Sequence, residues 1–102
     1  MTTTTTDRRT MADVKRANKA LGHHFFEPAA LRFFDGRVGA TLYGGRYFVT
    51  SEQMHGSTGS LPRAWTVRAA HDDGSIHTVG EFQAHATRDD AIAAARVLAH
   101  GA

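Results

Sequence analysis

The sequence contains no cysteine. This absence excludes disulfide bridges and thiolate metal sites, so packing and hydrogen bonds must hold the fold. No apolar run approaches the roughly 20 residues that a membrane-spanning helix needs. No hydrophobic segment follows Arg8 and Arg9, as it would in an export leader. We therefore expect a cytoplasmic protein without a membrane partner.

An excess of charge of one sign is also missing, since the formal net charge is only +2. Residues 1–50 carry eight Lys or Arg against four Asp or Glu, whereas residues 51–102 carry four against six. A small surplus of arginine raises the isoelectric point to about 9.5 without creating a strong field. The isoelectric point alone is therefore weak evidence for nucleic-acid binding.

The chain is long enough for one domain and too short for two. Its 102 residues, 41% of them hydrophobic, fit a single small core. We place the domain at residues 10–102, behind a Thr-rich tail at residues 1–9. That tail has too little apolar surface to fold alone and is either disordered or paired with a sheet edge or a neighbouring chain.

Hydrophobic spacing and turn residues predict an α+β fold: two N-terminal helices, a four-stranded antiparallel meander and a C-terminal helix packed on one face. Gly44-Gly45 and Asp72-Asp73-Gly74 are typical of hairpin turns. With Asp73-Gly74 at the turn centre, Trp65 pairs with Phe82 and Val67 with Gly80. The predicted helices span 10–21, about 28–34 and 87–100, and the predicted strands span 38–43, 46–52, 64–71 and 75–84, with a loop at 53–62.

The aromatic block at residues 22–37 holds four of the six phenylalanines and is expected to plug the core. Pro28 suits the first turn of a short helix that Asp35-Gly36 ends. A helix of barely two turns does not persist alone, so packing must hold it. The residues expected to be mostly buried are Phe25, Phe26, Leu31, Phe34, Trp65, Val67, Ile76, Phe82, Ile92, Ala95 and Leu98.

The same block resembles a family of small uncharacterised proteins from bacteriophages, prophages and bacteria. The resemblance covers roughly residues 15–52 and implies a mobile-element origin and a small protein in the host-cell cytoplasm; it implies no mechanism. It rests on a Gly-x-His-Phe-Phe…Arg-Phe-Phe-x-x-Arg pattern, formed here by Gly22, His24, Phe25, Phe26, Arg32, Phe33, Phe34 and Arg37, and on the segment Tyr47–Glu52.

Catalytic and metal motifs are missing. Seven histidines invite a metal hypothesis, but no His-Glu-x-x-His helix and no short-spaced carboxylate cluster accompanies them. His77, Glu81 and His85 share a strand face, yet a strand rises about 3.3 Å per residue, so they cannot converge on one ion. No nucleophile elbow is present. We expect neither enzymatic activity nor a cofactor.

Candidate binding residues fall into two groups. Arg32, Arg37, Tyr43, Arg46 and Tyr47 form a candidate partner-binding patch, because exposed guanidinium groups beside aromatic rings anchor protein partners. Alternatively, Arg32 and Arg37 pack on the aromatic block and pair with Asp35 or Glu27. The second group, Lys15, Arg16 and Lys19, is a basic helix stripe that suits a solvated face, or a nucleic-acid backbone.

These features favour a small non-catalytic binding protein that docks on a host or phage protein and modulates it. An inhibitor of a host process or of host defence is one form of such a protein. The alternatives are a nucleic-acid-binding accessory protein that uses the basic stripe, and a self-assembling structural protein that forms homo-oligomers.

Overall fold

The computed structural model describes residues 9–33, 36–56 and 59–101. The side chains of Arg32 and Phe33, like Phe34, Asp35 and nearly all of the predicted Thr-rich tail, lie outside the described part. No helix within those ranges is both long and apolar enough to cross a membrane.

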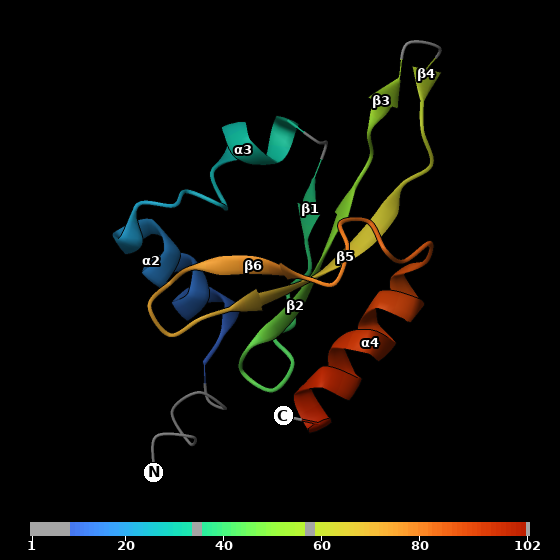
Figure 1. The fold of residues 1–102 in the computed structure, drawn as a ribbon. Coiled ribbons are helices and arrows are strands. Elements are labelled where there is room, and N and C mark those ends of the chain that lie inside the picture. Colours follow the sequence, from blue (N-terminus) through green and yellow to red (C-terminus); the bar gives the residue numbers. More distant parts are fainter. Residues whose placement is uncertain (1–8, 34–35, 57–58, 102) are drawn as a thin grey trace.

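The architecture is α+β, as predicted. A four-stranded antiparallel sheet of order β1-β2-β5-β6 lies between α2 and α3 on one side and α4 on the other (Figure 1). A separate two-stranded hairpin, β3-β4, projects from the sheet. The elements are α2 (Met11–Leu21), α3 (Pro28–Phe33), β1 (Arg37–Val38), β2 (Tyr47–Glu52), β3 (His55–Gly56), β4 (Gly59–Ser60), β5 (Ala64–Ala70), β6 (Ile76–Val79) and α4 (Arg88–Gly101).

The predicted register of the second hairpin is wrong by one residue. His71 and Ser75 close the turn, through a bond from the His71 N–H to the Ser75 carbonyl. The turn therefore has three residues, with Gly74 at φ 101° in the left-handed region. Val67 consequently pairs with Val79 rather than with Gly80.

The last predicted strand is also shorter than expected. It ends at Val79, because Gly80 and Gln83 adopt positive φ values of 76° and 57° that interrupt the ladder. The chain then rejoins β5 through a single bridge between Trp65 and His85, so Trp65 does not pair with Phe82.

The first hairpin and the following loop differ from prediction as well. Of the strand predicted at 38–43, only Val38 lies in β1, and Tyr43 forms an isolated bridge with Tyr47. The segment predicted as a loop at 53–62 instead contains β3 and β4, which pair with each other in antiparallel orientation.

The core has two halves, one on each face of the sheet, because neighbouring residues of a strand point to opposite sides. Phe48, fully buried, packs with Met11, Val14 and Ala70 on the α2 side. On the α4 side the buried residues are Val49, Val67, Ala91 and Ala95.

The aromatic block contributes to the core less than predicted. Val67 and Ala95 are buried as expected, whereas Phe25 and Phe26 are half-buried and pack against Phe48. The prediction that Phe82 is a core residue is wrong, because Phe82 is 42% exposed. Phe48, which was not on the predicted list, is the central aromatic residue. Leu31, Trp65, Ile76, Ile92 and Leu98 are half-buried.

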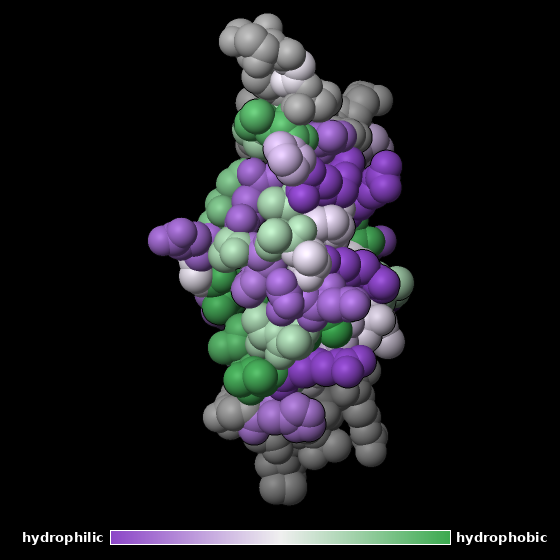
Figure 2. All heavy atoms as spheres, turned by 90° about the vertical axis from the view of Figure 1, so that its right-hand side faces the viewer, coloured by the Kyte–Doolittle hydropathy of each residue, from purple (hydrophilic) through white to green (hydrophobic). Residues whose placement is uncertain are grey.

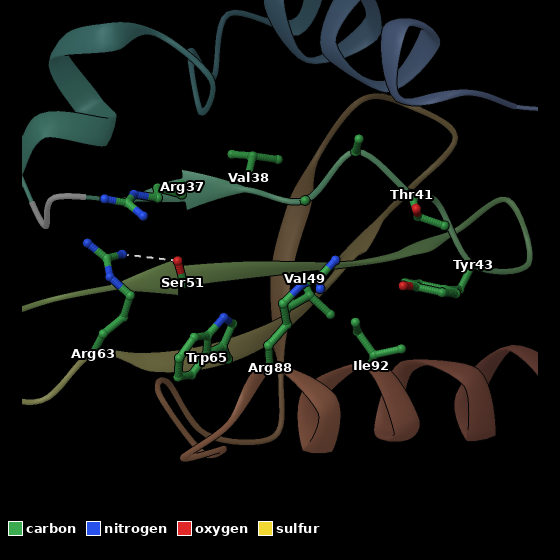
Figure 3. A pocket seen from close by; sticks show the side chains of 12 residues that line it. Arg37, Val38, Thr41, Tyr43, Val49, Ser51, Arg63, Trp65, Arg88 and Ile92 are labelled. Carbon is green, nitrogen blue, oxygen red and sulfur yellow. Dashed lines mark hydrogen bonds between the residues drawn. The ribbon is translucent and has the colours of Figure 1, made fainter.

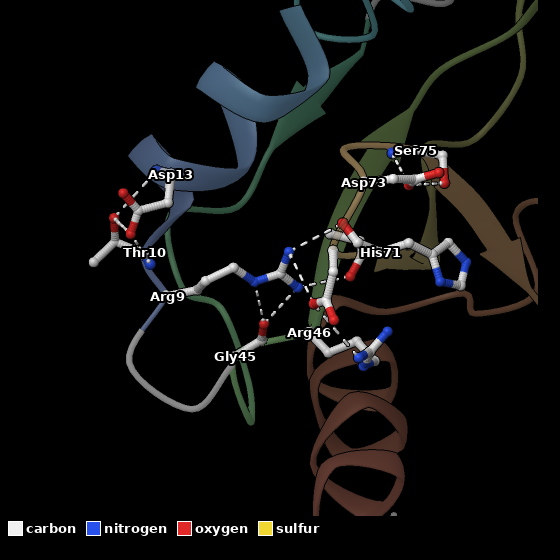
Figure 4. A network of polar contacts seen from close by, with 10 residues as sticks. Arg9, Thr10, Asp13, Gly45, Arg46, His71, Asp73 and Ser75 are labelled. Atoms are coloured by element: carbon white, nitrogen blue, oxygen red, sulfur yellow. Dashed lines mark hydrogen bonds and ion pairs between the residues drawn. The ribbon is translucent and has the colours of Figure 1, made fainter. Parts of the chain in front are cut away.

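Polar contacts fix the start of α2 (Figure 4). Thr10 and Asp13 form a capping box, and the hydrogen bonds from Thr10 lower the pKa of the Asp13 carboxyl. Arg9 donates to the carbonyls of Gly45, Ala70 and His71, and burial lowers the pKa of its guanidinium. Arg9 thereby ties the chain before α2 to both hairpins.

Candidate functional site

A groove of about 290 Å³ lies beside α4, over the part of the sheet formed by β1 and β2. Val49, Ser51 and Trp65 point from β2 and β5 toward this side. The helix α4 packs against β2 and β5, and Gly39, just after β1, has no side chain that could fill the remaining space. We call this the arginine groove, and it is lined by Arg37, Val38, Gly39, Ala40, Thr41, Tyr43, Val49, Ser51, Arg63, Trp65, Arg88 and Ile92.

Three arginines from three different segments surround the groove (Figure 3). Arg37 comes from β1, Arg63 from the segment before β5, and Arg88 from the first residue of α4. Arg63 donates to the Ser51 hydroxyl at 3.0 Å. Among the described residues that line the groove, none is Asp or Glu. The groove therefore concentrates positive charge.

Apolar side chains form part of the floor and walls of the arginine groove. Trp65 and Ile92 belong to the α4-side core and present their remaining exposed surface here. Tyr43 forms one end, and the Arg96 guanidinium lies 5.9 Å from its ring centroid. Figure 2 shows that hydrophilic and hydrophobic residues are interspersed on the face of the molecule that forms the right-hand side of Figure 1. A bound group would thus meet charge and apolar surface together.

A second pocket, of about 410 Å³, opens on the opposite face of the sheet. Its floor holds a buried ion pair in which Arg68 Nη2 lies 2.9 Å from Glu52 Oε2. Thr50 and Thr66 donate to the same carboxylate, and Arg68 also donates to Thr50 and Thr78. The Arg68 guanidinium lies between two rings, Phe25 at 5.4 Å and Phe82 at 5.5 Å.

The polar groups of this floor are satisfied by one another. Within the described ranges, no buried side-chain nitrogen or oxygen lacks a hydrogen-bond partner. The same part of the chain holds no group of three or more His, Asp or Glu side chains placed to bind a metal ion. This arrangement suits a structural network. In the arginine groove, by contrast, Arg37 and Arg88 have no acidic partner within the described residues.

The structure disperses the predicted partner-binding patch. Arg37 and Tyr43 both line the arginine groove. Arg46 instead lies near the second hairpin turn, with its guanidinium 3.9 Å from Asp72. Tyr47 packs with the α4-side core. Arg32 lies in α3, and its side chain is outside the described part of the chain.

The basic stripe lies on α2, whereas the arginine groove lies beside α4, on the other side of the sheet (Figure 1). Arg16 forms an ion pair with Asp13 at 3.0 Å. The Lys15 ammonium lies 5.8 Å from the Phe26 ring centroid, and Lys19 is exposed. Two of the three cations are therefore already engaged with neighbouring side chains.

Sequence reasoning did not select Arg63, Trp65 or Arg88 as binding residues. Arg63 and Trp65 are near neighbours in the sequence, but Arg88 is distant from both, and only the folded sheet and α4 bring it beside them. One signal was available for Arg88, because a basic residue in the first turn of a helix opposes the helix dipole. A residue that is unfavourable for its own helix is a candidate for function.

The model of a family of unknown function (DUF7447) matches residues 10–96, which is most of the chain. No curated protein matches the sequence, and no solved structure matches the fold.

Proposed function

The chain belongs to DUF7447, a family of unknown function, and we propose that it is a non-catalytic protein that docks on a protein partner through the arginine groove. The observation that carries this proposal is the convergence of three arginines and two aromatic rings on one open groove, with no carboxylate among the described residues that line it. The resemblance to bacteriophage and prophage proteins supports a host or phage protein as the partner in this proposal, with inhibition of a host process or defence as one form of the function.

The composition of the groove supports a protein partner. Trp, Tyr and Arg are the residues that most often carry the energy of protein interfaces, where aromatic anchors and guanidinium groups sit in desolvated pockets. The volume of about 290 Å³ suits one or two anchoring side chains of a larger partner. Trp65 and Tyr43 would supply contact area, and the arginines would supply orientation.

The positive charge of the groove favours a partner segment with negatively charged side chains. A guanidinium group binds a carboxylate through two parallel hydrogen bonds, and such bonds strengthen beside apolar surface. Neither Arg37 nor Arg88 has an acidic partner within the described residues. A segment with acidic side chains would therefore complement the groove.

Capture from bacterial lysate treated with nuclease tests this proposal. Tagged parent protein is compared with Arg37→Glu/Arg88→Glu, which reverses two groove charges, and with Lys15→Glu/Lys19→Glu, which changes the net charge equally on α2. We expect the parent and the α2 variant to retain the same protein, identified by mass spectrometry. Calorimetry with that purified partner should show an affinity loss of about tenfold or more for the groove variant alone.

Circular dichroism of both variants provides the control for folding. Equal binding by the parent and the groove variant would rule out the arginine groove as the docking site. Loss of binding in the α2 variant alone would move the site to the basic stripe.

A further inference from the structure

Within the described residues, no strand pairs with the outer edge of β1, which lies beside the arginine groove. The strand order places β1 and β6 at the two edges of the four-stranded sheet. In β1, Arg37 pairs with Ser51 and Val38 with Thr50, and the Gly39 N–H donates to the Val49 carbonyl at 2.8 Å. These contacts define which backbone groups of β1 face β2.

The outward-facing groups follow from the alternation of antiparallel ladders. Hydrogen-bonded pairs and non-hydrogen-bonded pairs alternate along such a ladder. Since Gly39 is hydrogen-bonded to Val49, Val38 belongs to a non-hydrogen-bonded pair. The N–H and C=O of Val38 therefore point away from β2, toward the open edge.

The residues after β1 leave room for another strand. Gly39, Ala40 and Thr41 are exposed and carry small side chains or none. Gly39 is also on the groove side, in register with Val49. A side chain from a strand beside β1 can consequently pass over Gly39 into the groove.

We propose that the partner enters as an extended acidic segment that adds a strand to the edge of β1. This inference rests on the proposed function and specifies its binding mode. Backbone pairing with Val38 supplies affinity, and alternate side chains of the segment supply specificity. An acidic side chain opposite Arg37 forms a cross-strand pair of unlike charges, and a second acidic side chain on the same face, two residues along, passes over Gly39 into the arginine groove.

The two edges of the sheet differ in the charge of the residues beside them. The edge of β1 lies beside Arg37, Arg63 and Arg88, whereas β6 follows a turn that contains Asp72 and Asp73. An acidic strand is attracted to the first edge and repelled by the second. A second copy of this chain is disfavoured at β1, because two-fold pairing would place the arginine grooves of both copies, which carry like charge, beside each other.

The binding mode is tested with a capped peptide of alternating valine and glutamate. Nuclear magnetic resonance spectra of labelled protein should show shifts at Val38 and its neighbours, and slower hydrogen exchange of the Val38 amide. A peptide with N-methyl groups on alternate amides removes the backbone donors and should bind about tenfold more weakly or worse. A valine-lysine peptide is the charge control and should not bind.

The matched variants are Val38→Pro and Val38→Ala. Proline removes the outward N–H and is tolerated at edge positions whose N–H faces solvent, whereas alanine keeps the N–H and removes the same side-chain packing. We expect peptide binding to fall further in the proline variant than in the alanine variant. Equal binding by the two variants, equal binding of the N-methylated peptide, or no binding of the valine-glutamate peptide at millimolar concentration would overturn strand addition.

Failure of strand addition is distinguishable from failure of the proposed function. If Val38→Pro keeps the captured partner while Arg37→Glu/Arg88→Glu loses it, the groove function stands and strand addition is wrong. If the groove variant also keeps the partner, the groove function is wrong. A dimer in sedimentation experiments that only Val38→Pro abolishes would show that a second copy occupies the edge, and would overturn the acidic segment.

Discussion

Glu52 and Arg68 form an ion pair that is nearly excluded from solvent, with side chains 5% and 12% exposed. Two threonine hydroxyls donate to the same carboxylate. Burial of two charges costs desolvation energy, which their attraction and the added hydrogen bonds offset. The pair therefore contributes mainly by specifying the arrangement of β2 against β5, and either charge alone is unfavourable in this place.

Replacement of Glu52 by Ala leaves the Arg68 charge buried without its partner. We expect a loss of about 3–5 kcal/mol in the free energy of unfolding, measured with urea. The double variant Glu52→Leu/Arg68→Met removes both charges and keeps apolar volume, so it should be markedly more stable than Glu52→Ala. A single variant within about 1 kcal/mol of the parent would show that water reaches and solvates Arg68.

This pair could not be predicted from sequence because it depends on register. Glu52 and Arg68 lie in two different predicted strands. The length of the segment between those strands does not determine which residues pair with each other. The contact requires Phe48 to align with Arg68 and Glu52 with Ala64, which the completed sheet determines. The same holds for the arginine groove, where Arg63 and Arg88 approach Arg37 only in the folded chain.

At the scale of elements, the contact between α2 and the second hairpin is unusually close. Gly74, at φ 101°, lies so near α2 that an added Cβ would be 2.3 Å from the Ala17 carbonyl oxygen. Asn18, which is buried, donates to the Gly74 carbonyl and accepts from the Phe25 N–H. Asn18 of α2 thus connects the turn that contains Gly74 to the aromatic block at Phe25.

Gly74→Ala should therefore push α2 away from the hairpin. Overpacking costs about 1–3 kcal/mol, and the left-handed backbone adds about 1–2 kcal/mol. Gly80→Ala is the matched control, because Gly80 also has positive φ and no atom lies within 4 Å of its added Cβ. Thermal unfolding should show a larger loss for Gly74→Ala; equal losses would indicate that backbone strain alone matters.

The elements themselves were largely predictable, because their signals are local. Pro28 marks the start of α3, and Gly22 caps α2 in the left-handed conformation with its N–H on the last carbonyls. The strands were less predictable, since one extra residue in the turn before Ser75 shifts every pair of the hairpin. Phe48 was missed as the central core residue because the aromatic block at 22–37 outweighed it by number alone.

At the scale of the molecule, the basic surplus is less available than the isoelectric point suggests. Arg9 is bound to backbone carbonyls, and Arg68 and Arg16 are paired with carboxylates. These contacts remove cations from the field that a polyanion would meet. The remaining positive charge in the arginine groove is compact, whereas a nucleic-acid backbone needs a track of phosphate contacts.

Nucleic-acid binding is therefore expected to be weak and nonspecific. Labelled single-stranded and double-stranded DNA and RNA of about 20 nucleotides should bind with Kd values no tighter than about 1 µM at physiological salt, in the range of nonspecific electrostatic association. Released counterions make such binding fall steeply with salt, whereas docking of a protein segment on Trp65 and Tyr43 should change less. Fluorescence anisotropy at salt concentrations from about 50 to 200 mM measures the affinity for the nucleic acids and for the protein segment. Nanomolar binding that disappears in Lys15→Glu/Lys19→Glu, and survives in Arg37→Glu/Arg88→Glu, would assign function to the α2 stripe and reverse the preference for a protein partner.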